Sequence, residues 1–438
     1  MKSKGLIIIC PSAIIGIFFI IFSCKPLEEF PDKLNTILPE KLIVAPDKYM
    51  EEMDATKGWT LLNGVSLELN SAEVHSGSGS IKLTSGVGVN AQMEKVVDWN
   101  FSSDQGESFR IWIFPHSDPA ITIGSIMVYL YKNDGYTEYA YISYSGELLL
   151  SQNKWTMLWK DPKIGSGWHL YGGYDMSVVH KIKILQITKS GQSSICSYDL
   201  ISEGQARKST LMISFDDNNL SQYTLAYPLI KAKGMVASCY IISDCINASD
   251  KLTSTQMQEL YATGWDICNH SKTHSHLDSM TQQQVEEDEL EACKMALDYL
   301  GLTRASKHVA YPYGEYDGNI IAAMDHWGAK SGRIVTSAYN LYEQGVYNLG
   351  FPFKINAIVI RNTTKLADAK SYIDLALTLN VSVTLLFHNF VEANPGEFDW
   401  LIADFSELLD YIESLDLQTL TIDEYYRLYS GPITVNHK

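Results

Sequence analysis

Hydrophobic and polar residues alternate in short runs between about residue 48 and residue 204. The runs are separated by turn residues, and Asn133-Asp134-Gly135 is a hairpin signal between two of them. The predicted strands are Ser66–Asn70, Ser80–Ser85, Ser108–Phe114, Ile126–Lys132, Glu138–Tyr144, Trp155–Lys160 and Lys181–Lys189. Because no segment of helical period interrupts them, the pattern predicts an all-β sandwich, jelly-roll-like, over residues 48–204.

The pattern changes at about residue 205, where apolar runs begin to alternate with segments of helical period. The predicted strands are Met235–Ile241, Trp265–Asn269, Val309–Tyr311, Val381–Phe387 and Leu417–Ile422, and the predicted helices are Thr255–Thr263, Thr281–Leu300, Ala369–Leu379 and Phe405–Leu415. The longest helix has a capping box at its start, formed by Thr281 and Gln284, and Gly301 at its end. Such alternation predicts a parallel sheet or barrel over residues 205–438, with functional groups at the carboxyl ends of the strands.

The first 23 residues have a pattern of their own. Two lysines precede an apolar run from Leu6 to Phe22, which is typical of a secretory signal peptide and too interrupted for a good membrane span. The Ile-Phe-Ser-Cys sequence that ends at Cys24 is similar to the lipobox of bacterial lipoproteins. That resemblance implies a lipid anchor at Cys24 and a place in the bacterial cell envelope, periplasmic or surface-exposed. Residues 24–47, with their prolines, are then a linker.

Charge and cysteine content narrow the function classes. A net charge of −17 argues against a nucleic-acid partner. Five cysteines follow Cys24, and none of them forms a CxxC motif. An odd number without this motif does not indicate a disulfide framework, and a single disulfide stays as an alternative. Cys239, Cys268 and Cys293 stand in apolar runs and are predicted to be small buried residues.

Polar residues follow several of the predicted strands in the second half. They are Asp216 and Asp217 after the apolar run 211–215, His270 and His274 after 265–269, the Tyr-Pro-Tyr-Gly sequence 311–314, and His388 after 381–387. Each alone has an ordinary explanation, such as a helix cap or a surface side chain. Together they are expected to meet at one barrel mouth. Two imidazoles and a carboxylate can hold a metal ion, a second carboxylate can take a proton from water, and another imidazole can protonate a leaving group.

In this order, Ser-Phe-Asp-Asp, His-x3-His, Tyr-Pro-Tyr-Gly and Leu-x-His resemble the motifs of the NodB-type polysaccharide deacetylases, carbohydrate esterase family 4. The resemblance covers residues 208–430. It implies a distorted (β/α) barrel of the NodB type and a hydrolase that removes acetyl groups from a polysaccharide.

The same resemblance implies roles for individual residues. Asp216 corresponds to the general base and His388 to the general acid. The backbone N–H of Tyr313 would help to hold the oxyanion. The metal ligands, for Zn²⁺ or another divalent transition metal, would be Asp217, His270 and His274.

Two departures from the family pattern are visible. The third motif has Ala310 where an arginine usually contacts the base, and Arg333 and Lys330 are the candidates to replace it. The pair that usually stands behind the general acid is matched only loosely by Asp325 and Trp327. The sequence therefore names no clear partner that would orient His388.

The expected substrate is a polymer of N-acetylated amino sugars, because the Ala-Tyr-Pro-Tyr-Gly form occurs in the poly-N-acetylglucosamine deacetylase branch. Two alternatives stay open: an O-acetyl esterase acting on a xylan-like glycan, and a catalytically silent glycan-binding lipoprotein. A glycosidase would need carboxylates on opposite sides of the sugar, which the adjacent Asp216 and Asp217 do not supply.

The first half contains a weaker glycan signal. Residues 75–84 resemble an early strand of jelly-roll carbohydrate-binding modules. Three aromatic pairs are expected to share strand faces, and they are Tyr129 with Tyr131, Tyr139 with Tyr141, and Trp155 with Trp159. Packing inside the sandwich is the favoured interpretation of these pairs, and stacking on sugar rings is the alternative.

Overall fold

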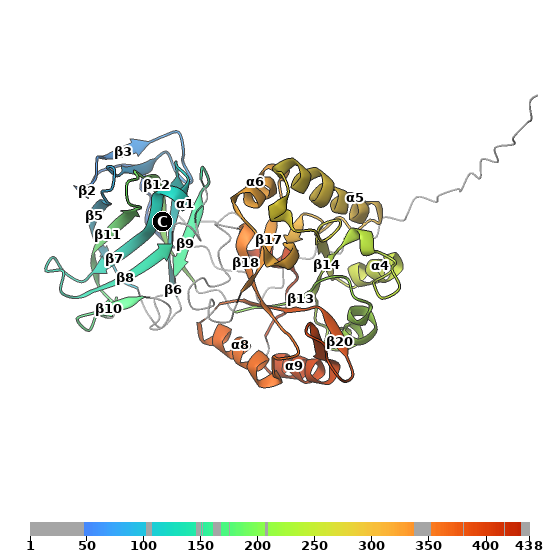
Figure 1. Cartoon of the computed structure of the whole chain (residues 1–438). Helices are drawn as coiled ribbons and strands as arrows, with labels where there is room; N and C mark the ends of the chain where they lie inside the picture. The colour runs from blue at the N-terminus through green and yellow to red at the C-terminus, as the bar shows by residue number, and fades with distance from the viewer. Residues whose placement is uncertain are drawn as a thin grey trace, which may run out of the picture.

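The computed structural model describes most of the chain from residue 48 to residue 430. The described ranges are 48–101, 107–145, 150, 152–160, 168–174, 176–205, 209–336, 352–379, 381–415 and 417–430. The expected signal peptide, Cys24 and the linker lie outside them. Figure 1 shows two lobes, a β-sheet lobe from the first half of the chain and a barrel with helices from the second.

The first lobe contains two antiparallel six-stranded sheets. The first sheet contains β1 (Lys48–Glu51), β3 (Ser66–Asn70), β4 (Ser80–Thr84), β6 (Glu107–Pro115), β9 (Thr156–Lys160) and β12 (Ile195–Gln205). The second contains β2 (Trp59–Asn63), β5 (Ala91–Trp99), β7 (Ile123–Tyr131), β8 (Tyr139–Ser145), β10 (His169–Tyr171) and β11 (Val179–Thr188). One hydrophobic core takes side chains from both sheets, such as Ile81 and Val128, so the predicted sandwich is confirmed.

Each predicted strand of the sandwich is present within a few residues, but β1, β2, β5, β10 and β12 were not predicted. The longest of these is β12. Its register shifts between Asp199 and Ile201, and Leu200 has a positive φ of 36°. Such a bulge breaks the period of two on which strand prediction depends. A short helix, α1 (Pro119–Thr122), also interrupts the strands.

The paired tyrosines lie on the outer face of the second sheet, so the interpretation that they pack inside the sandwich is wrong. Their neighbours Val128 and Leu130 face the core. Tyr129 stacks on Tyr141 across the strands with ring centroids 5.3 Å apart, and Tyr139 stacks on Tyr171 at 4.8 Å. The rings therefore form a tyrosine ladder whose faces are largely covered by one another. The side chain of Trp159 is outside the described part of the chain.

The second lobe is a closed barrel of seven parallel strands. The strands are β13 (Leu211–Phe215), β14 (Ser238–Ile241), β15 (Asp266–Asn269), β16 (His308–Ala310), β17 (Ser331–Thr336), β18 (Ile355–Val359) and β19 (Val383–Phe387). β19 pairs with β13 and closes the ring. The expected NodB-type barrel is therefore confirmed, and β17 and β18 are strands that the apolar pattern did not reveal.

Helices surround the barrel (Figure 1). They are α3 (Tyr227–Ala232), α4 (Ser254–Ala262), α5 (Ala292–Tyr299), α6 (Gly318–Trp327), α8 (Leu366–Leu379), α9 (Ile402–Ser414) and α10 (Ile422–Ser430), with π-helices η3 (Gln222–Ala226) and η6 (Gln284–Glu291) and 3₁₀ turns η4 (Ser243–Cys245), η5 (Leu277–Ser279), η7 (Pro312–Gly314) and η9 (Pro352–Lys354). The predicted helix 281–300 is thus η6 followed by α5, and its capping box is present.

The predicted last strand, Leu417–Ile422, is wrong. Thr419 makes a single bridge to Leu211, and the chain then enters α10 at Ile422. The apolar residues there are buried because they pack under the barrel, as Leu420 does, and not because they belong to its sheet. Local hydrophobicity cannot distinguish these two kinds of burial.

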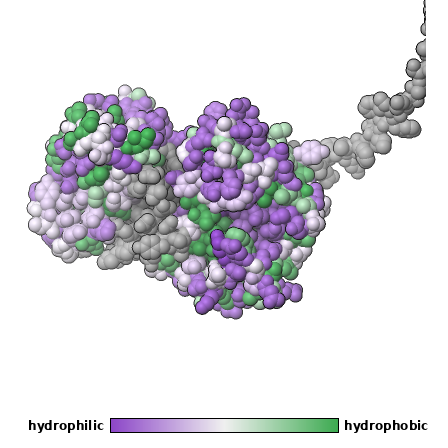
Figure 2. Space-filling view, viewed as in Figure 1, coloured by the Kyte–Doolittle hydropathy of each residue, from purple (hydrophilic) through white to green (hydrophobic). Residues whose placement is uncertain are grey.

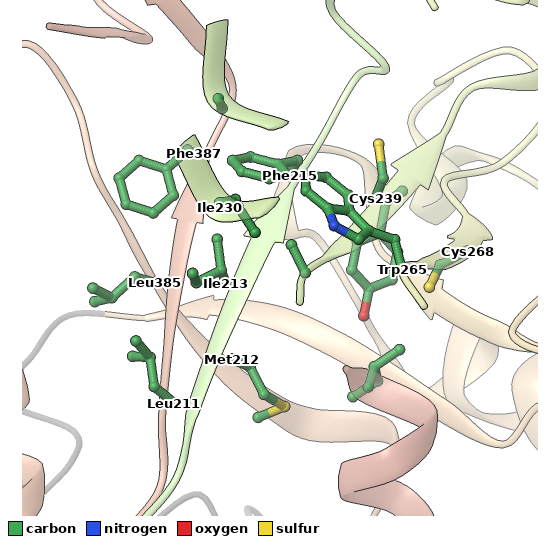
Figure 3. Packing of buried hydrophobic residues seen from close by; sticks show 14 of the residues in the cluster. Leu211, Met212, Ile213, Phe215, Ile230, Cys239, Trp265, Cys268, Leu385 and Phe387 are labelled. Carbon is green, nitrogen blue, oxygen red and sulfur yellow. The ribbon is translucent and has the colours of Figure 1, made fainter. Parts of the chain in front are cut away.

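The core between barrel and helices is rich in aromatic rings. Phe215, the last residue of β13, stacks on Trp265 with ring centroids 5.4 Å apart and tilts against Phe387 at 6.1 Å (Figure 3). This packing holds the end of β13 in place directly before the two aspartates. Cys239, Cys268 and Cys293 are buried free thiols in this lobe, as predicted.

The surface view shows mostly hydrophilic residues at the rim of the barrel lobe (Figure 2).

Two short strands, β20 (Asn389–Val391) and β21 (Asp399–Leu401), pair with each other just after β19. They carry the residues that follow His388. None of the helices in the described part of the chain is both long and apolar enough to cross a membrane.

Candidate functional site at the barrel mouth

The two aspartates stand where the chain leaves β13. Strand geometry ends at Phe215, although the Asp216 N–H still donates to Phe387 O at 3.1 Å. Asp217 and Asn218 then adopt left-handed backbone, with φ of 68° and 42°. Adjacent residues on a strand point to opposite faces, so this turn is what allows both carboxylates to face the barrel mouth.

The two histidines follow β15 in a similarly strained loop. Ser271 and His274 have φ of 64° and 61°. Residues with side chains are uncommon in this region of backbone space, and they cluster at functional sites. The Nδ1 of His270 is 2.8 Å from Ala310 O, which can only accept, so Nδ1 carries the proton and Nε2 is left as a lone-pair donor.

One carboxylate oxygen lies between the two imidazoles. The Oδ1 of Asp217 is 3.5 Å from His270 Nε2 and 3.7 Å from His274 Nε2. One ligand atom from each of these residues lies within 4.8 Å of the others. The structure therefore brings together the three predicted ligands in a set of two nitrogens and one oxygen, which suits Zn²⁺ and related ions.

The electrostatics of the pocket also suit a cation. Burial raises the pKa of Asp217, but the neighbouring His270, His388 and His274 lower it more, and the net result lies well below the usual range. Burial lowers the pKa of His270, whereas the carboxylates of Asp216 and Asp217 raise it, and the net shift is upward. Negative charge thus dominates around Nε2 of His270.

Arg333 occupies the role that Ala310 leaves open. Its Nη2 is 2.5 Å from Asp216 Oδ2, and both residues are almost fully buried. Arg333 lies on β17 directly beside Ala310, its register partner on β16. A guanidinium from the neighbouring strand therefore reaches the carboxylate across the small alanine side chain. Of the two candidates, Lys330 is excluded because its Nζ lies 2.7 Å from Asp423 instead.

Tyr313 lies beside the ligand set. It has a φ of 59° within η7, and its ring is 4.6 Å from the ring of His274. The ring of Tyr313 also stacks on the ring of His276, with centroids 4.0 Å apart and 9° between the planes. The structure thus places the ring of Tyr313 beside the ligand set, and the role of its backbone N–H as an oxyanion donor stays a prediction. His276 is a neighbour that the motif comparison did not single out.

His388 follows β19 on the opposite side of the mouth. Its Nδ1 is buried without a hydrogen-bond partner among the described residues, and its ring is 5.0 Å from that of Phe398. The loosely matched pair does not support it. Asp325 contacts Lys154 of the sandwich, and Trp327 donates to Glu291 at 2.8 Å. Burial lowers the pKa of His388.

Several buried polar atoms at this mouth have no hydrogen-bond partner in the described part of the chain. They are Asp216 Oδ1, Asp217 Oδ1, Asn218 Nδ2, Nε and Nη1 of Arg333, and His388 Nδ1. Buried polar groups are normally paired, so a group of unpaired ones indicates a missing ion, water or substrate. The donor set and these atoms together fit a bound divalent transition metal.

Comparison with known proteins agrees with the motifs. Residues 203–332 match the family model described as polysaccharide deacetylase. A Bacillus subtilis protein named "Putative polysaccharide deacetylase YxkH" is 30% identical over 139 residues, which are 32% of this chain and 49% of that protein. The poly-β-1,6-N-acetyl-D-glucosamine N-deacetylase of Staphylococcus epidermidis is 25% identical over 175 residues, 36% of this chain and 57% of the relative.

Among solved structures, a family 4 carbohydrate esterase from Streptomyces lividans aligns with a TM-score of 0.36 and 14% identity, over 50% of this chain and 94% of the other. The chain spans about half the length of the curated relatives it matches. The barrel lobe is therefore similar to the polysaccharide deacetylase family of hydrolases over residues 203–332, and the two-sheet lobe precedes it.

Proposed function

We propose that this chain is a metal-dependent deacetylase that removes acetyl groups from a polysaccharide of N-acetylated amino sugars. The observation that carries the proposal is the joint placement of Asp217, His270 and His274 with a second carboxylate, Asp216, and His388 at one barrel mouth. Relatives named as poly-β-1,6-N-acetyl-D-glucosamine N-deacetylases support the choice of an amino-sugar polymer.

Asp217, His270 and His274 would hold the metal. When bound, such an ion polarises a carbonyl oxygen and lowers the pKa of water toward neutrality. His270 is prepared for this by its hydrogen bond to Ala310 O, which fixes the ring and frees Nε2.

The remaining groups divide the proton transfers. Asp216 accepts a proton from the attacking water, and Arg333, at 2.5 Å, fixes the orientation of its carboxylate. The N–H of Tyr313 donates to the oxyanion of the tetrahedral intermediate. His388 gives a proton to the departing amine, which would otherwise leave as an unstable anion.

The test is acetate release by the full chain from N-acetylglucosamine oligomers and from acetylated xylan, with zinc and with a chelator. Chelator-sensitive release from the oligomers supports the proposal. Preferential release from xylan would make the protein an O-acetyl esterase. Zinc-loaded protein that binds these glycans and releases nothing would support the silent glycan-binding alternative. That alternative is weakened by Arg333, because the base is not left without its arginine.

A second measurement addresses the ligand assignment. His274→Ala removes one of three ligands, and zinc affinity is expected to fall by at least tenfold in competition with a chromogenic chelator. Wild-type zinc content in this variant would contradict the assignment. Tyr299→Ala on α5, where the side chain is 83% exposed, is a matched surface control.

We propose further that Cys24 is lipidated and tethers the protein to a membrane of the cell envelope. The support is the basic and apolar pattern of the first 23 residues and the lipobox-like sequence. Labelled palmitate is expected to enter the wild-type chain and not Cys24→Ala. Equal labelling of both would reject the anchor.

We propose that the sandwich contributes glycan binding through the open end of its tyrosine ladder. Tyr171, on the edge strand β10, is 48% exposed, and its stacking partner Tyr139 covers one ring face. Retention on an immobilised glycan is expected to fall in Tyr171→Ala and not in Tyr299→Ala. Unchanged retention in Tyr171→Ala would reject the role.

A further inference from the structure

A single buried glutamine joins the two sides of the proposed acid–base pair. The Nε2 of Gln222 lies 2.6 Å from the backbone oxygen of Asp216 and 2.8 Å from that of His388. Asp216 follows β13 and His388 follows β19, so the amide spans the ends of two neighbouring strands. Gln222 is fully buried.

The orientation of this amide is determined by its partners. Backbone carbonyl oxygens only accept, so the NH₂ group must face Asp216 and His388. The Oε1 then accepts a hydrogen bond from Cys239 Sγ, at 3.2 Å. Both amide hydrogens and the amide oxygen are used, which holds the side chain in one position.

The turn that carries Gln222 also holds the residues beyond the acid. Ser221 Oγ lies 2.5 Å from Asn389 Oδ1 and accepts from Phe390 N at 2.9 Å. Asn389 in turn donates to Asp399 at 2.8 Å. Ser221 immediately precedes the π-helix η3, and such short π segments are frequent at functional sites.

We infer that Gln222 is the positioning residue for the acid–base pair. It holds the backbone of His388 in place, and this replaces a side-chain partner that would orient the ring of the general acid. This inference rests on the proposed deacetylase function. The Nδ1 of His388 has no partner among the described residues, so the position of its ring depends on its backbone and on packing against Phe398. The backbone oxygen of His388 accepts from Gln222 and also from Asn219 Nδ2 at 3.0 Å.

The consequence is kinetic. Removing the bridge leaves the metal ligands Asp217, His270 and His274 untouched, but it allows the base and the acid to drift relative to each other. Misplacement of reacting groups by about 1 Å can cost roughly 100-fold in rate. The loss should appear in kcat, with KM and metal content retained, because the bridge contacts neither substrate nor metal.

The test compares Gln222→Met with wild type and with Thr224→Val. Methionine keeps an unbranched side chain of similar length and removes all three hydrogen bonds. Thr224 is an exposed residue of the same π-helix whose hydroxyl donates to Leu220 O, a contact within the turn itself, so its variant controls for local changes in η3. We expect kcat on N-acetylglucosamine oligomers to fall 10- to 100-fold in Gln222→Met, and to remain within twofold of wild type in Thr224→Val.

A substrate comparison separates positioning from general loss of structure. An aryl acetate has a good leaving group, so its hydrolysis does not need His388 as acid. In Gln222→Met, the rate of aryl acetate hydrolysis should therefore fall less than the rate on the N-acetyl substrate. A kcat of Gln222→Met equal to that of wild type would overturn the inference. So would a fall in kcat that is fully explained by a smaller amount of folded, metal-loaded protein.

A structural readout keeps the inference testable if the wild-type protein releases no acetate, an outcome that would reject the proposed function itself. In crystal structures of wild type and Gln222→Met, the distance between the Asp216 and His388 backbone oxygens is expected to increase in the variant. An unchanged distance and an unchanged His388 ring would overturn the inference whatever the activity.

Discussion

The two ends of the barrel carry similar buried polar residues in opposite states. At the base, His308 lies between Ser331 Oγ at 2.7 Å and Asp423 Oδ1 at 3.2 Å, which is the composition of a Ser-His-Asp triad. Asp423 also receives Lys330 at 2.7 Å and Arg427 at 2.9 Å. His308 is fully enclosed with both ring nitrogens partnered, and Asp423 is almost fully buried, whereas Lys330 and Arg427 reach Asp423 from partly exposed positions.

At the mouth, by contrast, several buried atoms of Asp216, Asp217, Arg333 and His388 have no partner among the described residues. The same residue types thus hold the fold together at one end and stand ready for ligands at the other. The difference teaches that residue type and burial do not identify a reactive site, and that single unpaired atoms, which also occur elsewhere in the described chain, do not either; the mouth is distinguished because several of them gather around one ligand set. Active sites of such barrels also lie at the carboxyl ends of the strands.

The largest expected effect that separates the two ends is that of Asp216→Asn. Losing the base should lower kcat by roughly 1,000-fold, within the range known for general base catalysis. Zinc content should remain, since Asp217 and not Asp216 is the assigned ligand. Loss of zinc together with activity would mean that the two aspartate roles are exchanged. Acetate release and metal analysis on the same sample check both points.

The second largest fall in kcat is expected for Arg333→Met. Asp216 would lose its buried cation, and kcat is expected to fall about 10- to 100-fold because the carboxylate loses its orientation. The double variant Ala310→Arg/Arg333→Ala moves the guanidinium to the neighbouring strand at the same register. Partial recovery of kcat relative to Arg333→Met is expected. An Arg333→Met enzyme as active as wild type would show that the ion pair is only structural.

These same residues show how much of the site could be predicted from the sequence. The strand-end motifs predicted the gathering of Asp217, His270 and His274, because parallel strands deliver their ends to one mouth. The sequence also named Arg333 and Lys330, but it could not choose between them. Their positions decide the question, since Arg333 on β17 is level with Ala310, whereas Lys330 immediately precedes β17 and contacts Asp423 at the base.

Other features were beyond the sequence for physical reasons. Gln222 acts through backbone carbonyls, and a backbone contact leaves no signature in its partners. The strands β17 and β18 contain polar residues such as Arg333 and Asn356, so their apolar runs are interrupted. The tyrosine ladder was assigned to the wrong face because alternation defines two faces without telling which one is inside.

At the base the expected effect is on stability. Asp423→Ala removes the partner of His308, Lys330 and Arg427 at a buried position, and it should lower the free energy of unfolding by about 3 kcal/mol. The kcat of the protein that remains folded should stay within twofold of wild type. Urea denaturation and activity at low temperature check this. A loss of kcat without loss of stability would break the proposed division between the two ends.

The smallest effect is a pH dependence of stability at the base. Burial lowers the pKa of His308, and hydrogen bonding to Asp423 offsets this only in part, so the folded protein binds this proton less readily than the unfolded chain. The contribution of His308 to stability is therefore complete above its unfolded pKa of about 6.5 and is lost as pH falls below it, by at most about 1.4 kcal/mol per pH unit.

His308→Gln should lack this part of the pH dependence. The difference between wild type and variant is measured as the change in unfolding free energy between pH 7.5 and pH 5.5. The histidines at the mouth are present in both proteins and cancel in the difference. Identical pH slopes in the two proteins would contradict a depressed pKa at His308.

The most direct test of the central claim is to remove and restore zinc on one sample of the full chain while following acetate release from N-acetylglucosamine oligomers. We predict one zinc per chain, loss of acetate release on chelation, recovery when zinc returns, and little change in the far-UV circular dichroism throughout. Acetate release that is unaffected by complete removal of the metal would contradict the assignment of the barrel mouth as a metal-dependent hydrolytic site.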